Sequence, residues 1–279
     1  MSPLAEGYPP PRQLLDRHGL HPKHSWGQNF LGDPGLLERI AAAAIPEPVP
    51  GAIEIGAGLG HLTARLLDRC ERLVAIERDR ELAPVLQAEL GAQPGFELCE
   101  DNALTVDYPA LAVRLGGRPP VVGNLPYQIV GPLLFVLLQA TNRLGDWTFL
   151  VQREVAQRLS ASPGGTVYGA LTAHLGLQRR ARALFPVHRA AFLPPPRVDS
   201  LLIRLEPLEQ PLVAPGSDLA ARVHRLIDAG FAQRRKTLAN SLRAGGWDDA
   251  ARRLSAAGID PTRRAETLAP LDFVRLAEA

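Results

Sequence analysis

The first two thirds of the chain alternate short, mainly apolar runs with segments in which apolar residues recur at helical spacing. The runs before residue 152 are 52–55, 73–76, 96–99, 120–123 and 147–151. Runs of this length, bounded by glycine, proline or charged residues, are typical of buried strands. Their alternation with helical segments predicts an α/β fold with a parallel, doubly wound sheet.

Further helices are predicted before the first of these strands and after the fifth. A short helix and linker are expected over residues 13–24, and a helix over residues 34–44 with Asp33 as its N-cap. Residues 152–159 and 168–177 also have helical spacing, and a turn rich in glycine and proline separates them.

Two later runs, near residues 177–185 and 198–205, predict an antiparallel pair of strands at the sheet edge. The proline-rich segment 206–216 indicates a domain boundary, because apolar residues beyond it recur at helical spacing. The expected parts are an N-terminal extension (1–24), a catalytic domain (25–205) and a small all-helical domain (206–279).

Composition narrows the class of protein. A chain of 279 residues can bury one large core and one small core. Cys70 and Cys99 form no C-x-x-C pair, so we expect neither a disulfide framework nor a metal site. The longest apolar stretch, near residues 129–138, is too short to span a bilayer, and the N-terminus lacks the apolar segment of a signal peptide. We therefore expect a cytoplasmic protein with no membrane partner.

The net charge of +2 hides an uneven distribution. Residues 51–150 carry twelve acidic and eight basic side chains, whereas residues 222–264 carry four acidic and ten basic ones. Residues 179–204 add six arginines against one aspartate. Basic charge gathered late in the chain is typical of a protein that binds a polyanion, although a solvated arginine-rich surface would have the same composition.

A glycine-rich turn over residues 56–60 follows the first predicted strand. Glycines at a strand-to-helix turn let the backbone approach a ligand closely. The third glycine comes one residue earlier than in the dinucleotide fingerprint G-x-G-x-x-G. Glu54, just before the turn, is unsuited to a phosphate and suited to a ligand that carries an amine. The turn therefore favours S-adenosylmethionine over NAD.

The next three strands also end in polar residues. Glu77 follows the second strand, where a carboxylate can accept hydrogen bonds from both ribose hydroxyls. Asp101 follows the third, where it could bind an adenine amino group, and Asn124 ends the fourth. Because ligands lie outside the carboxyl ends of the strands in open α/β sheets, these side chains and Gly56 are expected to meet in one crevice.

The tetrapeptide Asn124-Leu125-Pro126-Tyr127 is the most informative feature of the chain. The asparagine carbonyl, together with a backbone carbonyl beside the rigid proline, can accept both N–H bonds of an exocyclic amine. The tyrosine offers a ring on which a base can stack. The same residues are ordinary in a turn, and the adjacent cofactor motif is what favours an amine pocket.

Five motifs, in this order and spacing, resemble the rRNA adenine N6-dimethyltransferases, most closely the bacterial enzymes of the small ribosomal subunit. They are Gly27-Gln28-Asn29-Phe30-Leu31, Glu54-x-Gly56-x-Gly58-x-Gly60, Asn124-Leu125-Pro126-Tyr127, Phe192-x-Pro194-x-Pro196-x-Val198-x-Ser200 and Phe231-Ala232-Gln233-Arg234-Arg235-Lys236-Thr237-Leu238. The resemblance runs from about residue 21 to the C-terminus. It implies a Rossmann-like, class I S-adenosylmethionine-dependent methyltransferase fold followed by a small helical domain.

The resemblance also implies the reaction and its site. The reaction would be N6,N6-dimethylation of two adjacent adenosines in the 3′-terminal hairpin loop of 16S rRNA, on an immature small subunit and as part of ribosome biogenesis. The implied cofactor contacts are Asn29, Leu31, Gly56, Gly58, Glu77, Asp101 and Asn124. The implied contacts to the target adenine are Asn124, Leu125, Pro126, Tyr127 and Phe192.

Phosphate contacts are expected in the last part of the chain, from Arg222, Arg225, Arg234, Arg235 and Lys236.

We expect a monomer. Two other functions stay open: a related enzyme that methylates large-subunit RNA, as in macrolide resistance, and a largely non-catalytic ribosome-assembly or RNA-binding factor. The segment from Phe192 to Ser200 and the arginine-rich C-terminal part argue against the first, and the intact crevice argues against the second. Phe192 could also be a core aromatic.

Overall fold

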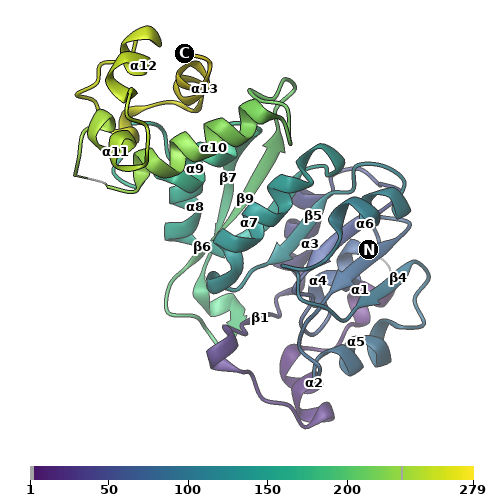
Figure 1. Ribbon diagram of the computed structural model, residues 1–279. Helices are drawn as coiled ribbons and strands as arrows, with labels where there is room; N and C mark the ends of the chain where they lie inside the picture. The colour runs from purple at the N-terminus through teal and green to yellow at the C-terminus, as the bar shows by residue number, and fades with distance from the viewer. Residues whose placement is uncertain (1–2, 234) are drawn as a thin grey trace. The chain divides into compact units, whose positions relative to one another are not determined.

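The computed structural model describes residues 3–233 and 235–279 and divides into two compact units (Figure 1). The first unit contains the residues up to 156 together with 183–205. The second contains residues 157–182 together with 206–279. The helical unit is thus built from two separate stretches of the sequence.

A seven-stranded sheet has the order β4-β3-β2-β5-β6-β9-β7. The strands are β2 (Ala52–Ile55), β3 (Leu73–Ile76), β4 (Phe96–Cys99), β5 (Val121–Asn124), β6 (Trp147–Gln152), β7 (Arg179–Val187) and β9 (Ser200–Pro207). The first five are parallel to their neighbours, and β9 pairs antiparallel with β6. This arrangement confirms the predicted doubly wound α/β fold and the position of the two late strands at one edge.

The helices of the first unit flank this sheet (Figure 1). They are α1 (Pro3–Gly7), α2 (Pro11–His18), α3 (Pro34–Ala44), α4 (His61–Leu66), α5 (Ala83–Leu90), α6 (Tyr108–Arg114) and α7 (Val130–Gln139), and α8 (Arg153–Leu159) follows β6. Every residue of β2 and β3 is buried, as expected for strands covered on both faces. Asp33 caps α3 as predicted, because its carboxylate accepts the Leu36 N–H at 2.7 Å.

Short elements complete the first unit. They are the 3₁₀ turns η1 (His24–Trp26), η2 (Tyr127–Ile129), η3 (Thr141–Arg143) and η4 (Arg189–Ala191) and the strands β1 (Phe30–Leu31) and β8 (Phe192–Leu193). β1 and β8 pair antiparallel, which places Leu31 opposite Phe192. The short helix expected within residues 13–24 is α2, which begins two residues earlier because proline favours the first turn, and Gly19 ends it in the left-handed conformation before the linker.

The second unit is helical, as predicted for the last part of the chain. Its helices are α9 (Ala170–Gly176), α10 (Asp218–Phe231), α11 (Leu238–Ala244), α12 (Ala250–Ala256) and α13 (Pro270–Glu278), with the 3₁₀ turn η5 (Ala265–Thr267). Val223, Leu226 and Ile227 on one face of α10 are fully buried in its core. Ala173 belongs to the same core, which is why α9 joins this unit. No described helix is long and apolar enough to cross a membrane.

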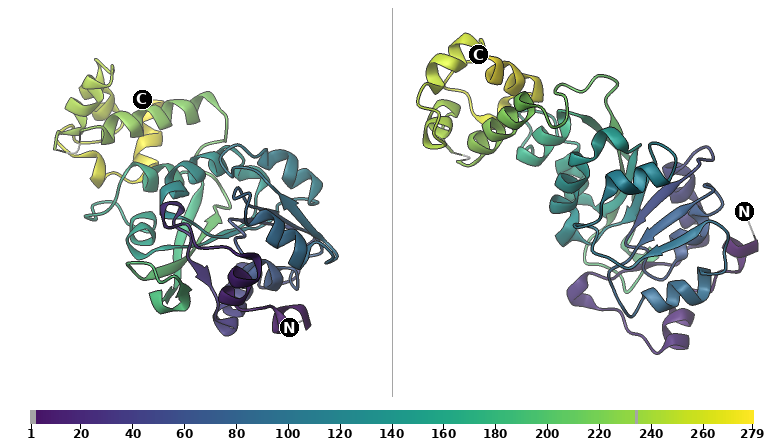
Figure 2. Two further views of the ribbon diagram at one scale, coloured as in Figure 1. Left: turned by 90° about the horizontal axis from the view of Figure 1, so that it is seen from below. Right: turned by 45° about the vertical axis from the view of Figure 1, so that its right-hand side comes forward.

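Residues 3–19 belong to the first unit, and α1 contacts α4, the helix that follows the glycine turn (Figure 2). Leu14 and Leu15 are buried in a cluster with Phe30 and Leu59. The Tyr8 hydroxyl donates to the carbonyl of Leu59 at 2.8 Å. The turn between β2 and α4 is therefore supported from behind by residues near the N-terminus.

This packing leaves no room for a side chain at Gly60. A Cβ added there would overlap the Tyr8 hydroxyl and lie 2.8 Å from Leu90 Cδ1, at a backbone φ of +84°. Gly164 has a similar φ of +82° but faces open space, so it is a matched control. Both alanine variants are strained at the backbone. We expect Gly60→Ala to lower the free energy of unfolding by about 1–3 kcal/mol more than Gly164→Ala, measured by urea denaturation. Equal losses would contradict the overlap.

Candidate active site

A cleft lies at the carboxyl ends of β2, β3 and β5, within the first unit. Its lining residues include Gly56, Gly58, Glu77, Asp101 and Asn124. Asn29 and Leu31 line the same cleft, and so do Leu125, Pro126, Tyr127 and Phe192. The structure therefore brings together, in one crevice, every residue expected to contact the cofactor or the target adenine.

The glycine turn closes one side of the cleft. Gly56 and Gly58 have φ values of +74° and +60°, which only glycine adopts readily. The Gly56 N–H donates to the Ile76 carbonyl at 2.9 Å, and the Gly58 N–H donates to Glu77 Oε2 at 2.9 Å. The turn after β2 is thus fastened to the end of β3.

Glu77 is the buried link between these elements. Its side chain is held from both ends, because Oε1 accepts the Asp79 N–H at 2.9 Å while Oε2 accepts the Gly58 N–H. Burial raises the pKa of Glu77, and the backbone hydrogen bonds oppose that shift. Each carboxylate oxygen keeps a lone pair for a second donor, such as a ribose hydroxyl.

Glu54 lies in the middle of β2 and is almost completely buried. Burial, together with the smaller effect of the nearby charge of Glu77, raises its pKa to about 8. Its Oε2 atom has no hydrogen-bond partner among the described residues. A buried acceptor without a donor is costly, so the cleft is ready for a ligand that brings N–H groups or a positive charge.

Asp101 is exposed at the rim of the cleft, after β4. Its Oδ1 accepts the Asn102 N–H at 2.6 Å and the Thr105 hydroxyl at 3.3 Å. These bonds fix the carboxylate while leaving its other oxygen for a ligand.

Asn124 ends β5 at the centre of the cleft. Its Nδ2 donates to the Asn29 carbonyl at 3.0 Å, which leaves Oδ1 as the acceptor atom of the amide. Asn29 is itself held by a bond from its Nδ2 to the Gly27 carbonyl at 2.9 Å. A Cβ at Gly123 would lie 2.5 Å from the Ile55 carbonyl, so glycine is needed for β5 to run this close to β2.

Two aromatic rings line the cleft beside Asn124. The Tyr127 side chain is 58% exposed, whereas Phe192 is only 6% exposed. Phe192 belongs to a core cluster as well as to the cleft wall, so the two functions considered for it are compatible. Pro126 opens η2 by accepting the Ile129 N–H at 3.2 Å.

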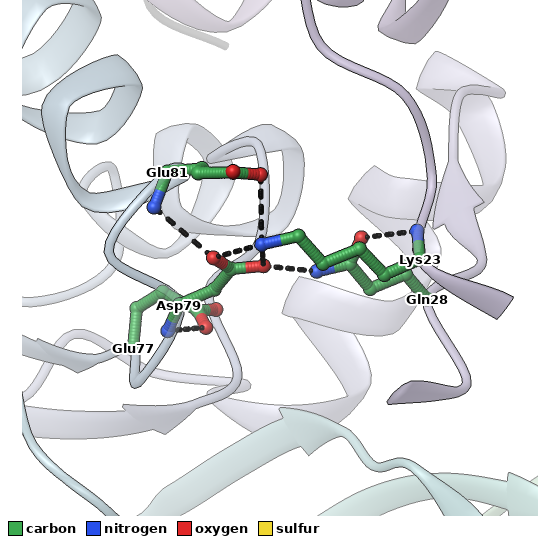
Figure 3. A network of polar contacts seen from close by, with 5 residues as sticks. All are labelled: Lys23, Gln28, Glu77, Asp79 and Glu81. Atoms are coloured by element: carbon green, nitrogen blue, oxygen red, sulfur yellow. Dashed lines mark hydrogen bonds and ion pairs between the residues drawn. The ribbon is translucent and has the colours of Figure 1, made fainter. Parts of the chain in front are cut away.

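A polar network that the motifs did not indicate joins the loop before β1 to the segment after β3 (Figure 3). Lys23 Nζ lies 2.7 Å from Asp79 Oδ1 and 2.7 Å from Glu81 Oε2. Gln28 Nε2 donates to Asp79 Oδ2 at 2.6 Å. The one signal for this contact in the sequence is Asp79, an acidic residue two positions after Glu77. An ion pair between residues 56 positions apart leaves no local pattern.

The basic residues expected to contact phosphate lie in the second unit. Arg225, Arg235 and Lys236 are exposed. Arg222 is exposed too, but its Nη1 donates to the Ala277 carbonyl at 2.9 Å, so it also fastens the end of α13. Arg234 lies outside the described residues.

Comparison with known proteins identifies the relatives of this chain. Residues 19–279 match the family described as "Ribosomal RNA adenine dimethylase". "Ribosomal RNA small subunit methyltransferase A" of Anaeromyxobacter sp. (strain K) is 43% identical, over 98% of both chains. The protein of the same name from Myxococcus xanthus (strain DK1622) is 43% identical, over 96% of this chain and 94% of its own length.

Solved structures agree on the fold. The crystal structure of the 23S rRNA methyltransferase ErmE has a TM-score of 0.69 at 26% identity, covering 90% of this chain and 98% of that one. A dimethyladenosine transferase from Plasmodium falciparum has a TM-score of 0.70 at 23% identity, covering 88% and 95%. The second of these likenesses supports the Rossmann-like methyltransferase fold alone.

The raised pKa of Glu54 predicts a pH dependence of stability. Its pKa is about 8 in the folded protein against an ordinary value of 4.5, so the folded state keeps a proton that the unfolded chain has released. Glu54 therefore lowers the free energy of unfolding as pH rises from about 5 to about 8, by at most about 1.4 kcal/mol per pH unit. Glu54→Gln should flatten this part of the stability profile, measured by urea denaturation of the ligand-free protein.

Glu97→Gln is the matched control, since Glu97 is half exposed and pairs with Arg114 on the surface. That variant is expected to keep the slope of the parent protein. A Glu54→Gln profile parallel to that of the parent would show that Glu54 titrates near its ordinary pKa.

Proposed function

The chain belongs to the ribosomal RNA adenine dimethylase family, and from this premise we propose that it dimethylates N6 of two adjacent adenosines in the 3′-terminal hairpin loop of 16S rRNA. The observation that carries the proposal is the fixed amide of Asn124, whose acceptor atom lies in the cleft beside the glycine turn. The methyl donor of these enzymes is S-adenosylmethionine, which supplies a methyl group on a positively charged sulfur.

The cleft fits that cofactor. Gly56 and Gly58 let the backbone of the turn approach the methionine part, and Asn29 and Leu31 line the same cleft. The unpartnered oxygen of Glu54 suits an ammonium group, because it lacks a donor among the described residues. We assign the ribose hydroxyls to Glu77 and the adenine to Asp101 with its neighbouring backbone.

The target amine would lie between two acceptors. Asn124 Oδ1 is the first. The Leu125 carbonyl is the better second acceptor, because the Pro126 carbonyl already accepts the Ile129 N–H. Accepting both N–H bonds would draw the amine out of conjugation with the ring and aim its lone pair at the methyl group. The methylated nitrogen is acidic, so the scheme requires no strong general base.

The target base must leave its stack to enter the cleft, which costs a few kcal/mol and least in an RNA loop. The exposed ring of Tyr127 offers a stacking surface, and Phe192, paired with Leu31 across β1 and β8, forms a buried wall of the cleft. Stacking of this kind contributes roughly 1–3 kcal/mol per contact, enough to offset the cost of unstacking.

The small subunit is favoured as substrate over the large one. Relatives that are 43% identical over nearly the whole chain carry a small-subunit name, whereas the 23S rRNA methyltransferase is 26% identical. The intact cleft does not favour a non-catalytic factor. We also propose that the enzyme acts as a monomer, since the first unit alone supplies every residue assigned to the cofactor and to the adenine.

Asn124→Ala is expected to abolish methyl transfer and to spare RNA binding, because it removes the acceptor that holds the amine. The assay is transfer of labelled methyl to small subunits that lack the modification, followed by nucleoside analysis for N6,N6-dimethyladenosine. Asn142→Ala is the control, as this asparagine is exposed and outside the cleft. Turnover by Asn124→Ala within about threefold of the parent rate would remove Asn124 from the mechanism. Label on large-subunit RNA alone would overturn the proposed substrate.

Arg235→Gln combined with Lys236→Gln is expected to weaken small-subunit binding while leaving S-adenosylmethionine binding unchanged. Both side chains are exposed, so their loss removes charge without disturbing the core. If each contacts one phosphate, the slope of log affinity against log salt should fall by roughly 0.7–0.9 per residue. Arg252→Gln, on an exposed arginine paired with Asp249, is the control. An unchanged slope in the double variant would place the RNA elsewhere.

A further inference from the structure

The loop 23–29 and the segment 77–81 are held together by ion pairs and hydrogen bonds (Figure 3), and also by cation–π contacts. Lys23 Nζ bonds both carboxylate oxygens of Asp79, at 2.7 and 2.9 Å, and also reaches Glu81. The Gln28 side chain bridges the two sides, accepting the Lys23 N–H at 2.8 Å and donating to Asp79 at 2.6 Å. The Trp26 ring lies 4.3 Å from the Arg78 guanidinium and 5.1 Å from Lys23 Nζ.

This network touches the cleft at both ends. On one side, the Asp79 N–H donates to Glu77, whose other oxygen holds the glycine turn. On the other side, Gln28 is followed directly by Asn29, whose carbonyl accepts from Asn124. The contacts thus form a continuous path from the carboxylate assigned to the ribose to the amide assigned to the target amine.

We propose that Lys23 and Asp79 are positioning residues that fasten the loop 23–29 across the cleft and so set its affinity for S-adenosylmethionine. The inference rests on the cofactor assigned above. Neither residue touches the reacting atoms. They act through Gln28 and Glu77, which line the cleft while Lys23 and Asp79 lie behind them.

The burial of the pair explains why it can carry this function. The Asp79 side chain is 3% exposed, so breaking its bond to Lys23 leaves a buried carboxylate without its ammonium partner. The bonds from Lys23, the Glu81 N–H and Gln28 lower the pKa of Asp79 even though burial alone would raise it. Loss of the Lys23 ammonium group would therefore remove the ion pairs that join the loop 23–29 to the segment after β3.

The surface pair Arg17–Glu89 offers a matched comparison. Arg17 Nη1 lies 2.7 Å from Glu89 Oε1, the same separation as Lys23 and Asp79, and this pair joins α2 to α5. The Arg17 side chain is 46% exposed, and neither member lines the cleft. Loss of this pair tests anchorage of the N-terminal segment without disturbing the loop 23–29.

The experiment measures the Kd of S-adenosylhomocysteine by calorimetry without RNA, and KM and kcat for methylation of small subunits. Lys23→Met is expected to raise Kd, and KM for S-adenosylmethionine, about tenfold, while kcat at saturating cofactor changes less than about threefold. Lys23→Arg keeps a cation that can bond Asp79 and should restore Kd to within about threefold. Arg17→Met should leave Kd within about twofold of the parent value.

Asp79→Asn is the second variant, and it keeps the shape of the side chain in case Lys23→Met fails to fold. Its effect should be smaller, about threefold in Kd, and it should add little in the presence of Lys23→Met because the two residues act as one unit. Unchanged Kd in both variants, or a loss confined to kcat, would overturn the inference and leave the proposed function intact. Failure of the parent protein to bind S-adenosylhomocysteine would instead overturn the proposed function.

Discussion

The cleft depends on the two hydrogen bonds that the Glu77 carboxylate accepts. This carboxylate accepts one N–H from the glycine turn and one from Asp79, each at 2.9 Å, and so joins the ends of β2 and β3 to the segment that leads into α5. A buried carboxylate is stable only when donors surround it, and here two backbone N–H groups supply that stabilisation. The conformation of the turn, with φ values open to glycine alone, follows from the need to present the Gly58 N–H to this carboxylate.

Further contacts hold the glycine turn and the segment after β3 in place around Glu77. The N-terminal residues support the turn from behind, through Tyr8 and the buried leucines of α2, while Lys23 and Gln28 hold the segment after β3. The turn is therefore fixed on one side by packing and on the other by charge. The family match begins at residue 19. Tyr8 and the buried leucines of α2 therefore lie outside the matched region, although Tyr8 bonds the glycine turn directly.

The sequence was sufficient for the parts of the fold that depend on local pattern. Five parallel strands, the cap at Asp33 and the meeting of Gly56, Glu77, Asp101 and Asn124 in one cleft follow from apolar runs and from the polar residue at each strand end. The structure added what depends on distant partners. The Lys23–Asp79 pair spans 56 positions, and the packing of α9 with α10 depends on a core shared across the segment that contains β7. No periodicity or spacing encodes such contacts, because each member looks like an ordinary surface or helix residue by itself.

The electrostatics of the cleft follow from the same constraint. Glu77 is supplied with donors, but Glu54 beside it has an oxygen without one among the described residues, and the charge of Glu77 raises the pKa of Glu54. A cation bound near Glu54 would favour the ionised form of this side chain, whereas the raised pKa of Glu54 keeps it protonated in the ligand-free cleft. Lys23 does not line the cleft, and its ammonium group bonds Asp79 and Glu81 instead. The Glu54 oxygen that has no donor among the described residues therefore favours a ligand with positive charge, and this preference is why a sulfonium cofactor fits a glycine turn that would otherwise resemble a nucleotide site.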